Sequence, residues 1–304
     1  MEPKTYVKAV ESFNKAITLM PDVPTLANIH AWLAGCYREL KQYPNAIAAA
    51  KESLRLRPNY ADTILGLGRT YYLAGQHQNA LATFQEALRL NPKDAETINQ
   101  TGLVYRALEQ FAEAVDAHKE AIQLKPTEGL YHSNLGLTYV EMGMKEQAMA
   151  VQQTLQRIDS AKAKALDEQI KSIFPNDKDD PENLLVYASI ASNMGYPQAA
   201  LPVYRRVLLL KPEADAIAVA YRDMGDAYRQ LKKSAEAAAA YQQALVVYQR
   251  LLRAKPQEAP LVYGLGHTYL GLGQKEQAIQ VQRRLMALDK KYAQDLLDEI
   301  NKSR

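Results

Sequence analysis

The chain has 304 residues and a formal net charge of only +3 at pH 7. Its lysines and arginines are dispersed without a basic run, so the composition gives little support for nucleic-acid binding. No apolar run approaches the roughly 18 residues of a membrane span, and polar residues follow Met1 where a signal peptide would carry an apolar core. We therefore expect a soluble protein with no membrane span in this chain.

The single cysteine, Cys36, excludes an internal disulfide and fits a small buried residue within a helix. It does not decide the redox compartment. A cytoplasmic location is slightly favoured, and a periplasmic or membrane-anchored one would fit if an N-terminal segment had been removed.

The first predicted element is a lone amphipathic helix, which forms a half repeat at residues 5–22. Ala9, Phe13, Ala16 and Pro21 have the spacing that the second helix of a repeating unit shows later in the chain. Such a helix would expose a face made to pack against a missing partner. We therefore expect an open edge at the N-terminal end of the structure.

Four units with a period of 34 residues follow, and each is predicted to form two antiparallel helices. Proline ends the second helix of the first three units, because it lacks an amide donor, and glycine ends several first helices along the whole chain, as at Gly75, Gly143 and Gly273, where a left-handed residue is needed. In three of these units the first helix holds a glycine with a tyrosine three residues later, whereas Ala34 replaces the glycine in the first unit, and an alanine begins each second helix. A fixed period of this length is typical of repeats that stack. The four units span residues 27–60, 61–94, 95–128 and 129–162.

The second half of the chain is predicted to repeat this arrangement less regularly. A capping helix at 161–174 completes a first array at 1–174, and a polar linker at 175–180 leads to a second array at 181–304. The second array comprises units at 181–214, 215–258 and 259–292 and a C-terminal capping helix that carries Ala293, Leu296, Leu297 and Ile300.

The unit at 215–258 is longer than the others, and about seven of its extra residues are expected to extend the second helix by close to two turns. Because two turns preserve the facing stripe, this extension should be ordered and not looped out.

The stretch from Ile64 to Pro92 resembles a tetratricopeptide (TPR) repeat in the residues Leu67, Gly68, Tyr71, Gly75, Ala80, Phe84, Ala87 and Pro92. The resemblance implies an all-α fold, a TPR-like α-solenoid of antiparallel helix pairs that forms a right-handed superhelix, here with a division into two arrays. It also implies a concave groove, lined by the first helices, in which a peptide or helix of a partner lies.

Groove positions of the first array supply the candidate partner-binding residues, which are Trp32, Arg38, Arg69, Tyr72, Asn99, Gln100, Arg106 and Asn134. Trp32 is predicted to be a hydrophobic anchor for the partner, with packing between repeats as the alternative of equal weight. The three arginines would form a ladder that binds carboxylates of an acidic segment. Solvated side chains, or ion pairs with Glu39, Asp62 and Glu96, are the alternative for this ladder.

Groove residues are also predicted for the second array, namely Arg222, Asp226, Arg229, Tyr263 and His267, whereas Tyr221 is expected in the core. The five histidines of the chain are scattered and no pair has the i, i+4 spacing of a helical metal site, so His118 and His132 are expected to be packed or solvated imidazoles. Asp177, Asp179 and Asp180 lack the glycine and the closing glutamate of a calcium loop.

No catalytic or phosphate-binding motif is found, so we expect no enzyme activity, no cofactor and no metal. The predicted function is a non-enzymatic protein–protein interaction scaffold that binds a partner peptide or helix, of acidic or mixed charge, in its concave groove. The alternative is a self-associating structural or complex-assembly factor that docks through its open N-terminal edge. A regulatory subunit of an enzyme encoded elsewhere is a third class. The Lys, Asn and Arg clamp of chaperone-binding family members is not matched, which argues against a co-chaperone role.

Overall fold

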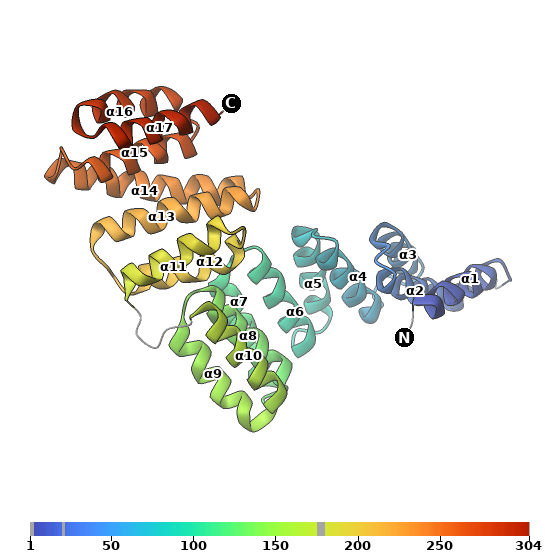
Figure 1. The fold of residues 1–304 in the computed structure, drawn as a ribbon. Helices are drawn as coiled ribbons and strands as arrows, with labels where there is room; N and C mark the ends of the chain where they lie inside the picture. The colour runs from blue at the N-terminus through green and yellow to red at the C-terminus, as the bar shows by residue number, and fades with distance from the viewer. Residues whose placement is uncertain (1–2, 20–21, 175–179, 304) are drawn as a thin grey trace. The chain divides into compact units, whose positions relative to one another are not determined.

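A computed structural model describes residues 3–19, 22–174 and 180–303, and all regular secondary structure in these ranges is α-helical (Figure 1). The all-α fold that the repeats predicted is therefore confirmed. Pro21, Asp177 and Asp179, together with most of the predicted linker at 175–180, lie outside the described residues.

The chain divides into two compact units, which are described separately below. The first unit comprises Met1–Thr138 and Gln153–Ala163, and the second comprises Tyr139–Gln152 and Lys164–Arg304. The predicted division into two arrays with a linker at 175–180 remains a prediction.

Helices of the first half of the chain come in the predicted order, with one helix ahead of the first pair. Their bounds are α1 (Pro3–Leu19), α2 (Val23–Glu39), α3 (Tyr43–Leu56), α4 (Ala61–Leu73), α5 (His77–Leu90), α6 (Ala95–Ala107), α7 (Phe111–Leu124), α8 (Gly129–Glu141) and α9 (Lys145–Ile158).

The remaining helices include two single helices, α10 and α17, besides the pairs. Their bounds are α10 (Ser160–Ile173), α11 (Pro181–Asn193), α12 (Pro197–Leu209), α13 (Ala214–Gln230), α14 (Ser234–Ala254), α15 (Ala259–Gly271), α16 (Lys275–Leu288) and α17 (Lys290–Lys302).

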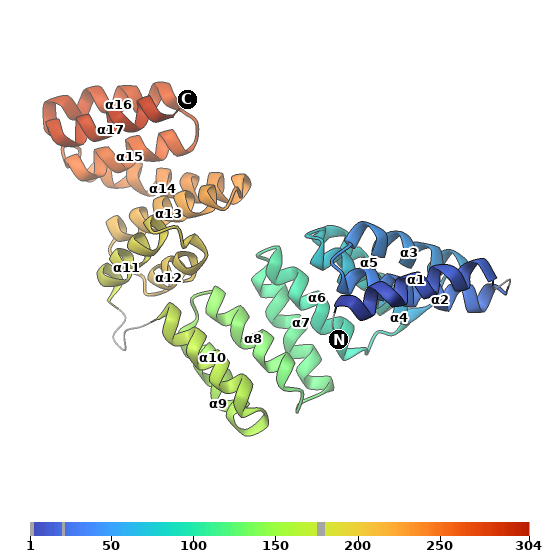
Figure 2. The same ribbon diagram turned by 45° about the vertical axis from the view of Figure 1, so that its right-hand side comes forward.

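Within each unit, neighbouring helices form antiparallel pairs that pack side by side. In the first unit α2 packs on α3, α4 on α5 and α6 on α7, and α1 packs on α2 (Figure 1). In the second unit α11 packs on α12, α13 on α14 and α15 on α16, while α17 covers both α15 and α16 (Figure 2).

Glycine ends several first helices in the left-handed conformation. Gly75, Gly143 and Gly273 have φ of 72°, 75° and 72°, as the sequence predicted. Lys41, Glu109 and Lys232 occupy the equivalent turns with φ near 58° although they carry a Cβ atom. The two-helix hairpin therefore imposes this turn even where the sequence lacks glycine.

Close helix pairing depends on a glycine in the first helix that faces a large ring in the second. A Cβ atom at Gly68 would lie 2.4 Å from the Phe84 ring, and one at Gly225 would lie 2.6 Å from the Tyr241 ring. Ala34 replaces this glycine in α2, and there the facing position holds the small residue Ala50; both alanines belong to the same buried cluster. A large side chain thus faces a small one in the pairs of Gly68 and Gly225, whereas two small side chains face each other in the pair of Ala34, and in each case the buried space is filled.

The alanines predicted at the start of the second helices are buried, since all of them are at most 5% exposed: Ala46, Ala80, Ala114, Ala148, Ala200, Ala237 and Ala278. Larger side chains here would push the helices apart.

The predicted extension in the second unit is confirmed as ordered helix. α14 has 21 residues, seven more than the 14 of α5 or α16, and α13 has 17 residues against 13 in α15. Tyr241, Ala244, Tyr248 and Leu252 all stay buried along α14, so the apolar stripe keeps its phase through the added turns. Tyr221, expected in the core, is half-buried and packs against both buried clusters of this unit.

Candidate functional site

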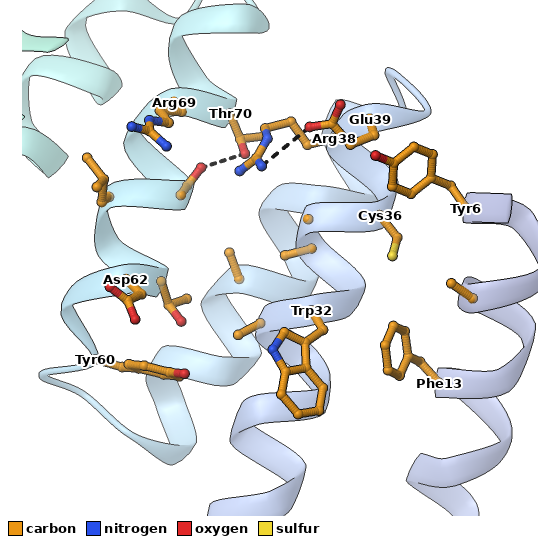
Figure 3. Close-up of a pocket in the computed structure, with 18 of the residues that line it drawn as sticks. Tyr6, Phe13, Trp32, Cys36, Arg38, Glu39, Tyr60, Asp62, Arg69 and Thr70 are labelled. Carbon is orange, nitrogen blue, oxygen red and sulfur yellow. Dashed lines mark hydrogen bonds and ion pairs between the residues drawn. The ribbon is translucent and has the colours of Figure 1, made fainter. Parts of the chain in front are cut away.

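The first unit carries a pocket of about 760 Å³ between α1, α2 and α4, which we call the groove pocket (Figure 3). Three of the predicted site residues, Trp32, Arg38 and Arg69, line it. The other labelled lining residues are Tyr6, Phe13, Cys36, Glu39, Tyr60, Asp62 and Thr70.

Trp32 is the most exposed large aromatic residue of the pocket, with 55% of its surface accessible. Its ring centroid lies 5.9 Å from that of Phe13 on α1, at an interplanar angle of 34°. Burial of so large an apolar side chain is favourable, by about 25 cal/mol for each Å² removed from water. The indole therefore packs against α1 on one side and leaves most of its surface for another contact.

Arg38 and Arg69 each form an ion pair within the first unit. Arg38 Nη2 lies 3.4 Å from Glu39 Oε1, and Arg69 pairs with Glu96 of α6. Two of the ion pairs that the sequence allowed as the alternative to an arginine ladder are therefore present. With Asp62 also at the pocket, the lining charges are of mixed sign.

Asn99 and Asn134, two other predicted groove residues, are buried at 1% and 7% exposure. Asn134 Nδ2 donates to Asn99 Oδ1 at 3.1 Å, and His118 Nδ1 lies 2.9 Å from the same oxygen. Asn99, His118 and Asn134 thus form a buried polar cluster that joins α6, α7 and α8. A Cβ atom at Gly102 would lie 2.7 Å from the His118 ring, which places this histidine in the slot that Phe84 fills in α5.

The remaining candidates, Tyr72, Gln100 and Arg106, are half-buried, and none of them lines the groove pocket. The Tyr72 ring packs 5.6 Å from that of His77. Arg106 acts electrostatically on His118 in the buried cluster.

Burial and the nearby charge of Arg106 lower the pKa of His118 from 6.5 to about 3. The folded protein therefore holds this imidazole neutral over a range in which the unfolded chain protonates it. Because the unfolded state binds more protons between pH 3 and 6.5, stability falls as the pH drops through this range.

His118→Phe is expected to remove that acid sensitivity, since phenylalanine already fills the same slot at position 84. The free energy of unfolding of the unmodified chain should lose about 2 kcal/mol from this residue between pH 7 and pH 5, and the variant should not. Urea denaturation at both pH values measures the difference. Parallel pH dependence in the two proteins would contradict a neutral buried His118.

In the second unit, hydrogen bonds link Asp226 of α13, His267 of α15 and Glu299 of α17. We call these three residues the carboxylate–histidine cluster. His267 Nε2 lies 2.8 Å from Asp226 Oδ2, and His267 Nδ1 lies 2.8 Å from Glu299 Oε2. Tyr241 donates to Asp226 at 2.8 Å and Tyr263 donates to Glu299 at 2.5 Å. Both imidazole nitrogens thus face carboxylates, which requires a proton on each.

Burial alone would disfavour the imidazolium of His267, but the hydrogen bonds and charges of Asp226 and Glu299 outweigh it and raise its pKa to about 9. The cluster adjoins a pocket of about 330 Å³ that the predicted residues Arg222, Arg229 and Tyr263 also line. Arg222 and Arg229 are engaged with Asp223 and Asp226, at 2.7 Å and 2.8 Å. The predicted groove residues of the second array therefore meet in one place.

Two residues of these sites were not among the predicted ones, namely Phe13 of the groove pocket and Glu299 of the carboxylate–histidine cluster. Phe13 was noticed only as part of the half repeat, and its position one helix before Trp32 was the signal that could have placed it at the pocket. The apolar stripe that identifies the capping helix in the sequence gives no indication of Glu299, which lies outside that stripe.

None of the helices in the described part of the chain combines the length and apolar character needed to cross a membrane. Within the same ranges, no group of three or more His, Cys, Asp or Glu residues is placed to hold a metal ion. His118 and His132 bond instead to Asn99 and to the carbonyl oxygen of Pro126.

Antiparallel helix pairs that repeat along each unit define a helical-repeat scaffold for protein–protein interaction. Sequence models of tetratricopeptide repeats match residues 25–93 and 216–291, residues 102–143 and residues 131–162. The chain belongs to the tetratricopeptide repeat family.

Solved structures of similar fold include a crystal structure of MamA, with 23% identity, coverage of 52% of this chain and 91% of that chain, and a TM-score of 0.46. YrrB, described as a TPR protein with an unusual peptide-binding site, has 18% identity, coverage of 68% and 96%, and a TM-score of 0.42. A tetratricopeptide repeat protein from Parabacteroides merdae has 15% identity, coverage of 91% and 99%, and a TM-score of 0.43. A comparison with curated protein sequences finds no match.

Proposed function

We propose that the first unit binds a segment of a partner protein in the groove pocket. The observation that carries this proposal is the 55% exposed Trp32 beside Phe13 in a cavity of about 760 Å³. Tryptophan is one of the residues enriched among those that dominate binding energy at protein interfaces. Cavities that bury a ligand well commonly measure about 300–1,000 Å³, so the size also fits.

The charges around the pocket support a partner segment of mixed character. Arg38 of α2 and Arg69 of α4 both line the pocket, but Glu39 and Glu96 already pair with them. A carboxylate of the partner must therefore displace Glu96 to reach Arg69. An apolar anchor against Trp32 with one acidic residue nearby suits this lining better than a uniformly acidic peptide.

Substitution of the pocket residues tests the proposal. Trp32→Ala combined with Arg69→Glu is expected to weaken partner binding by at least about 2 kcal/mol, or roughly 30-fold, because both the anchor and the cation are lost. Capture from source lysate on the immobilised chain, followed by titration of the protein retained, measures the effect. Arg55→Glu is the matched control, since Arg55 lies on α3 with Glu52 as its partner and is outside the pocket lining.

Equal retention of the same protein by the chain with both pocket substitutions would contradict a site in the groove pocket. Glu96→Gln tests for a change in the opposite direction. It frees Arg69 from its ion pair, so a partner segment that carries a carboxylate should bind more tightly. Circular dichroism must be unchanged in all variants for the comparison to hold.

The alternative function, self-association through α1, finds less support. Apart from Val7 and Leu19, at 46% and 70% exposure, the exposed residues of α1 are polar or charged. We therefore expect a monomer in light scattering over a wide concentration range. A mass that rises with concentration would favour the assembly function.

A further inference from the structure

α1 carries the apolar residues that a second helix turns toward the first helix of its pair, but in α1 these side chains are less deeply buried than in a complete pair. In α5 the slot residues Ala80, Phe84 and Ala87 are 0%, 0% and 7% exposed. Their counterparts in α1, Ala9, Phe13 and Ala16, are all half-buried. α1 packs on α2, which is the first helix of the next pair, and the described residues place no helix on the opposite side of α1. That side of α1 is uncovered in the described part of the chain.

The complete pairs of this chain show what covers such a slot. The Phe84 ring lies against Gly68 of α4, the His118 ring against Gly102 of α6, and the Tyr241 ring against Gly225 of α13, each so close that a Cβ atom would come within 2.7 Å. In these three pairs the cover is the first helix of the same pair, and a glycine gives it the necessary close approach.

The open slot of α1 faces the groove pocket. Ala9 and Phe13 line that pocket together with Trp32 and Cys36 of α2 (Figure 3). Phe13 touches Trp32 on one side, and the space beside the two rings belongs to the cavity. A helix seated here would contact α1 and α2 as α4 contacts α5 and α6.

We propose that the partner segment is an amphipathic helix that docks against α1 and α2 and completes the helical pair. It places a glycine or alanine over Phe13, and by analogy with Leu67, Gly68 and Tyr71 of α4 it carries a leucine one residue before and a tyrosine three residues after. This inference rests on the proposed function, because it names the partner of the same pocket. It fixes that partner as a helix with a small residue at the centre of its apolar face.

Trp32 reports docking directly, because it is the only tryptophan of the chain and is 55% exposed. The probe is a peptide of residues 61–76, which carries α4 and its turn and contains no tryptophan, with blocked termini. Its addition to the full chain should shift Trp32 emission to the blue in a saturable manner.

A Gly68→Leu version of the peptide is the matched control. Leucine is a better helix former and is more apolar, so nonspecific binding should become tighter. Docking over Phe13 instead predicts binding at least tenfold weaker. Phe13→Ala in the protein should weaken binding of the original peptide to a similar extent, whereas Arg55→Glu, which lies outside the pocket lining, should leave it nearly unchanged.

An isolated helix of this length is marginal in water, so the same contact is also tested within one chain. Residues 61–76 are joined directly to Tyr6, which keeps the register in which His77 follows Gln76 in the natural pair. This fusion should raise the Tm by several degrees and shift Trp32 emission, and its Gly68→Leu version should do neither.

An unchanged Trp32 spectrum in the fusion, or equal behaviour of the glycine and leucine versions, would overturn the helix-docking inference. A concentration-dependent dimer that itself buries Trp32 would also overturn it, because a second copy would then fill the slot. The proposed function fails separately, through partner capture that is insensitive to the Trp32 and Arg69 substitutions.

Discussion

His267→Leu is expected to lower the free energy of unfolding by about 2–3 kcal/mol. The substitution leaves Asp226 of α13 and Glu299 of α17, both largely buried, without the cation between them, and removal of one partner from a buried charge pair is strongly destabilising. Urea denaturation followed by circular dichroism measures the loss. Arg229→Ala is the control, because Arg229 pairs with the same Asp226 but has 59% of its side chain exposed, and it should cost less than about 1 kcal/mol.

The same cluster gives stability a defined dependence on pH. The pKa of His267 is raised from 6.5 to about 9, so the folded state binds more protons than the unfolded state between these values. The stabilisation of the folded state by protonated His267 is fully present below pH 6.5. It is lost as the pH rises through 9, which lowers the free energy of unfolding by about 2–3 kcal/mol. Identical pH profiles for the unmodified chain and for His267→Leu in this window would contradict a protonated bridge.

Gly68→Ala and Gly35→Ala are expected to change stability in opposite directions, although both glycines lie inside first helices. A Cβ atom at Gly68 meets the Phe84 ring at 2.4 Å, and such overpacking costs about 1–3 kcal/mol. A Cβ atom at Gly35 meets nothing within 4 Å, so alanine should stabilise α2 by about 0.5–1 kcal/mol through its higher helix propensity.

Chemical denaturation of both variants at one temperature checks the signs. Phe84→Leu added to Gly68→Ala should recover part of the loss, because the smaller side chain makes room for the methyl group. Destabilisation of equal size at positions 35 and 68 would mean that the ring contact does not control pairing.

Most of the fold follows from the period and from the sizes of a few residues. Gly68, Ala80 and Phe84 recur at fixed spacing because each pair needs a close approach in one place and a ring in another, and a pattern of this kind is visible in sequence. The left-handed residues Lys41 and Glu109 were not predicted, since the hairpin imposes their φ and nothing in their side chains indicates it.

The site was predicted less completely. Helical spacing brought Trp32, Arg38 and Arg69 to one pocket, but it placed Asn99 on the same polar face without indicating that the helices cover it. The presence of His118 four residues after Ala114, where Phe84 follows Ala80, was a signal for a buried polar cluster. The sequence did not decide whether Arg69 pairs with Glu96, because two side chains on neighbouring first helices can either contact each other or point into solvent.

The lengthened α14 indicates which insertions a helix of this fold can accept. Seven residues are almost two turns, so the stretch after the extension is rotated by only about 20° and Tyr248 still meets Gly264 of α15. An insertion of two or five residues would instead turn Tyr248 and Leu252 toward solvent. Insertions and deletions within a helix of this kind are therefore tolerated only when their length is close to a whole number of helical turns.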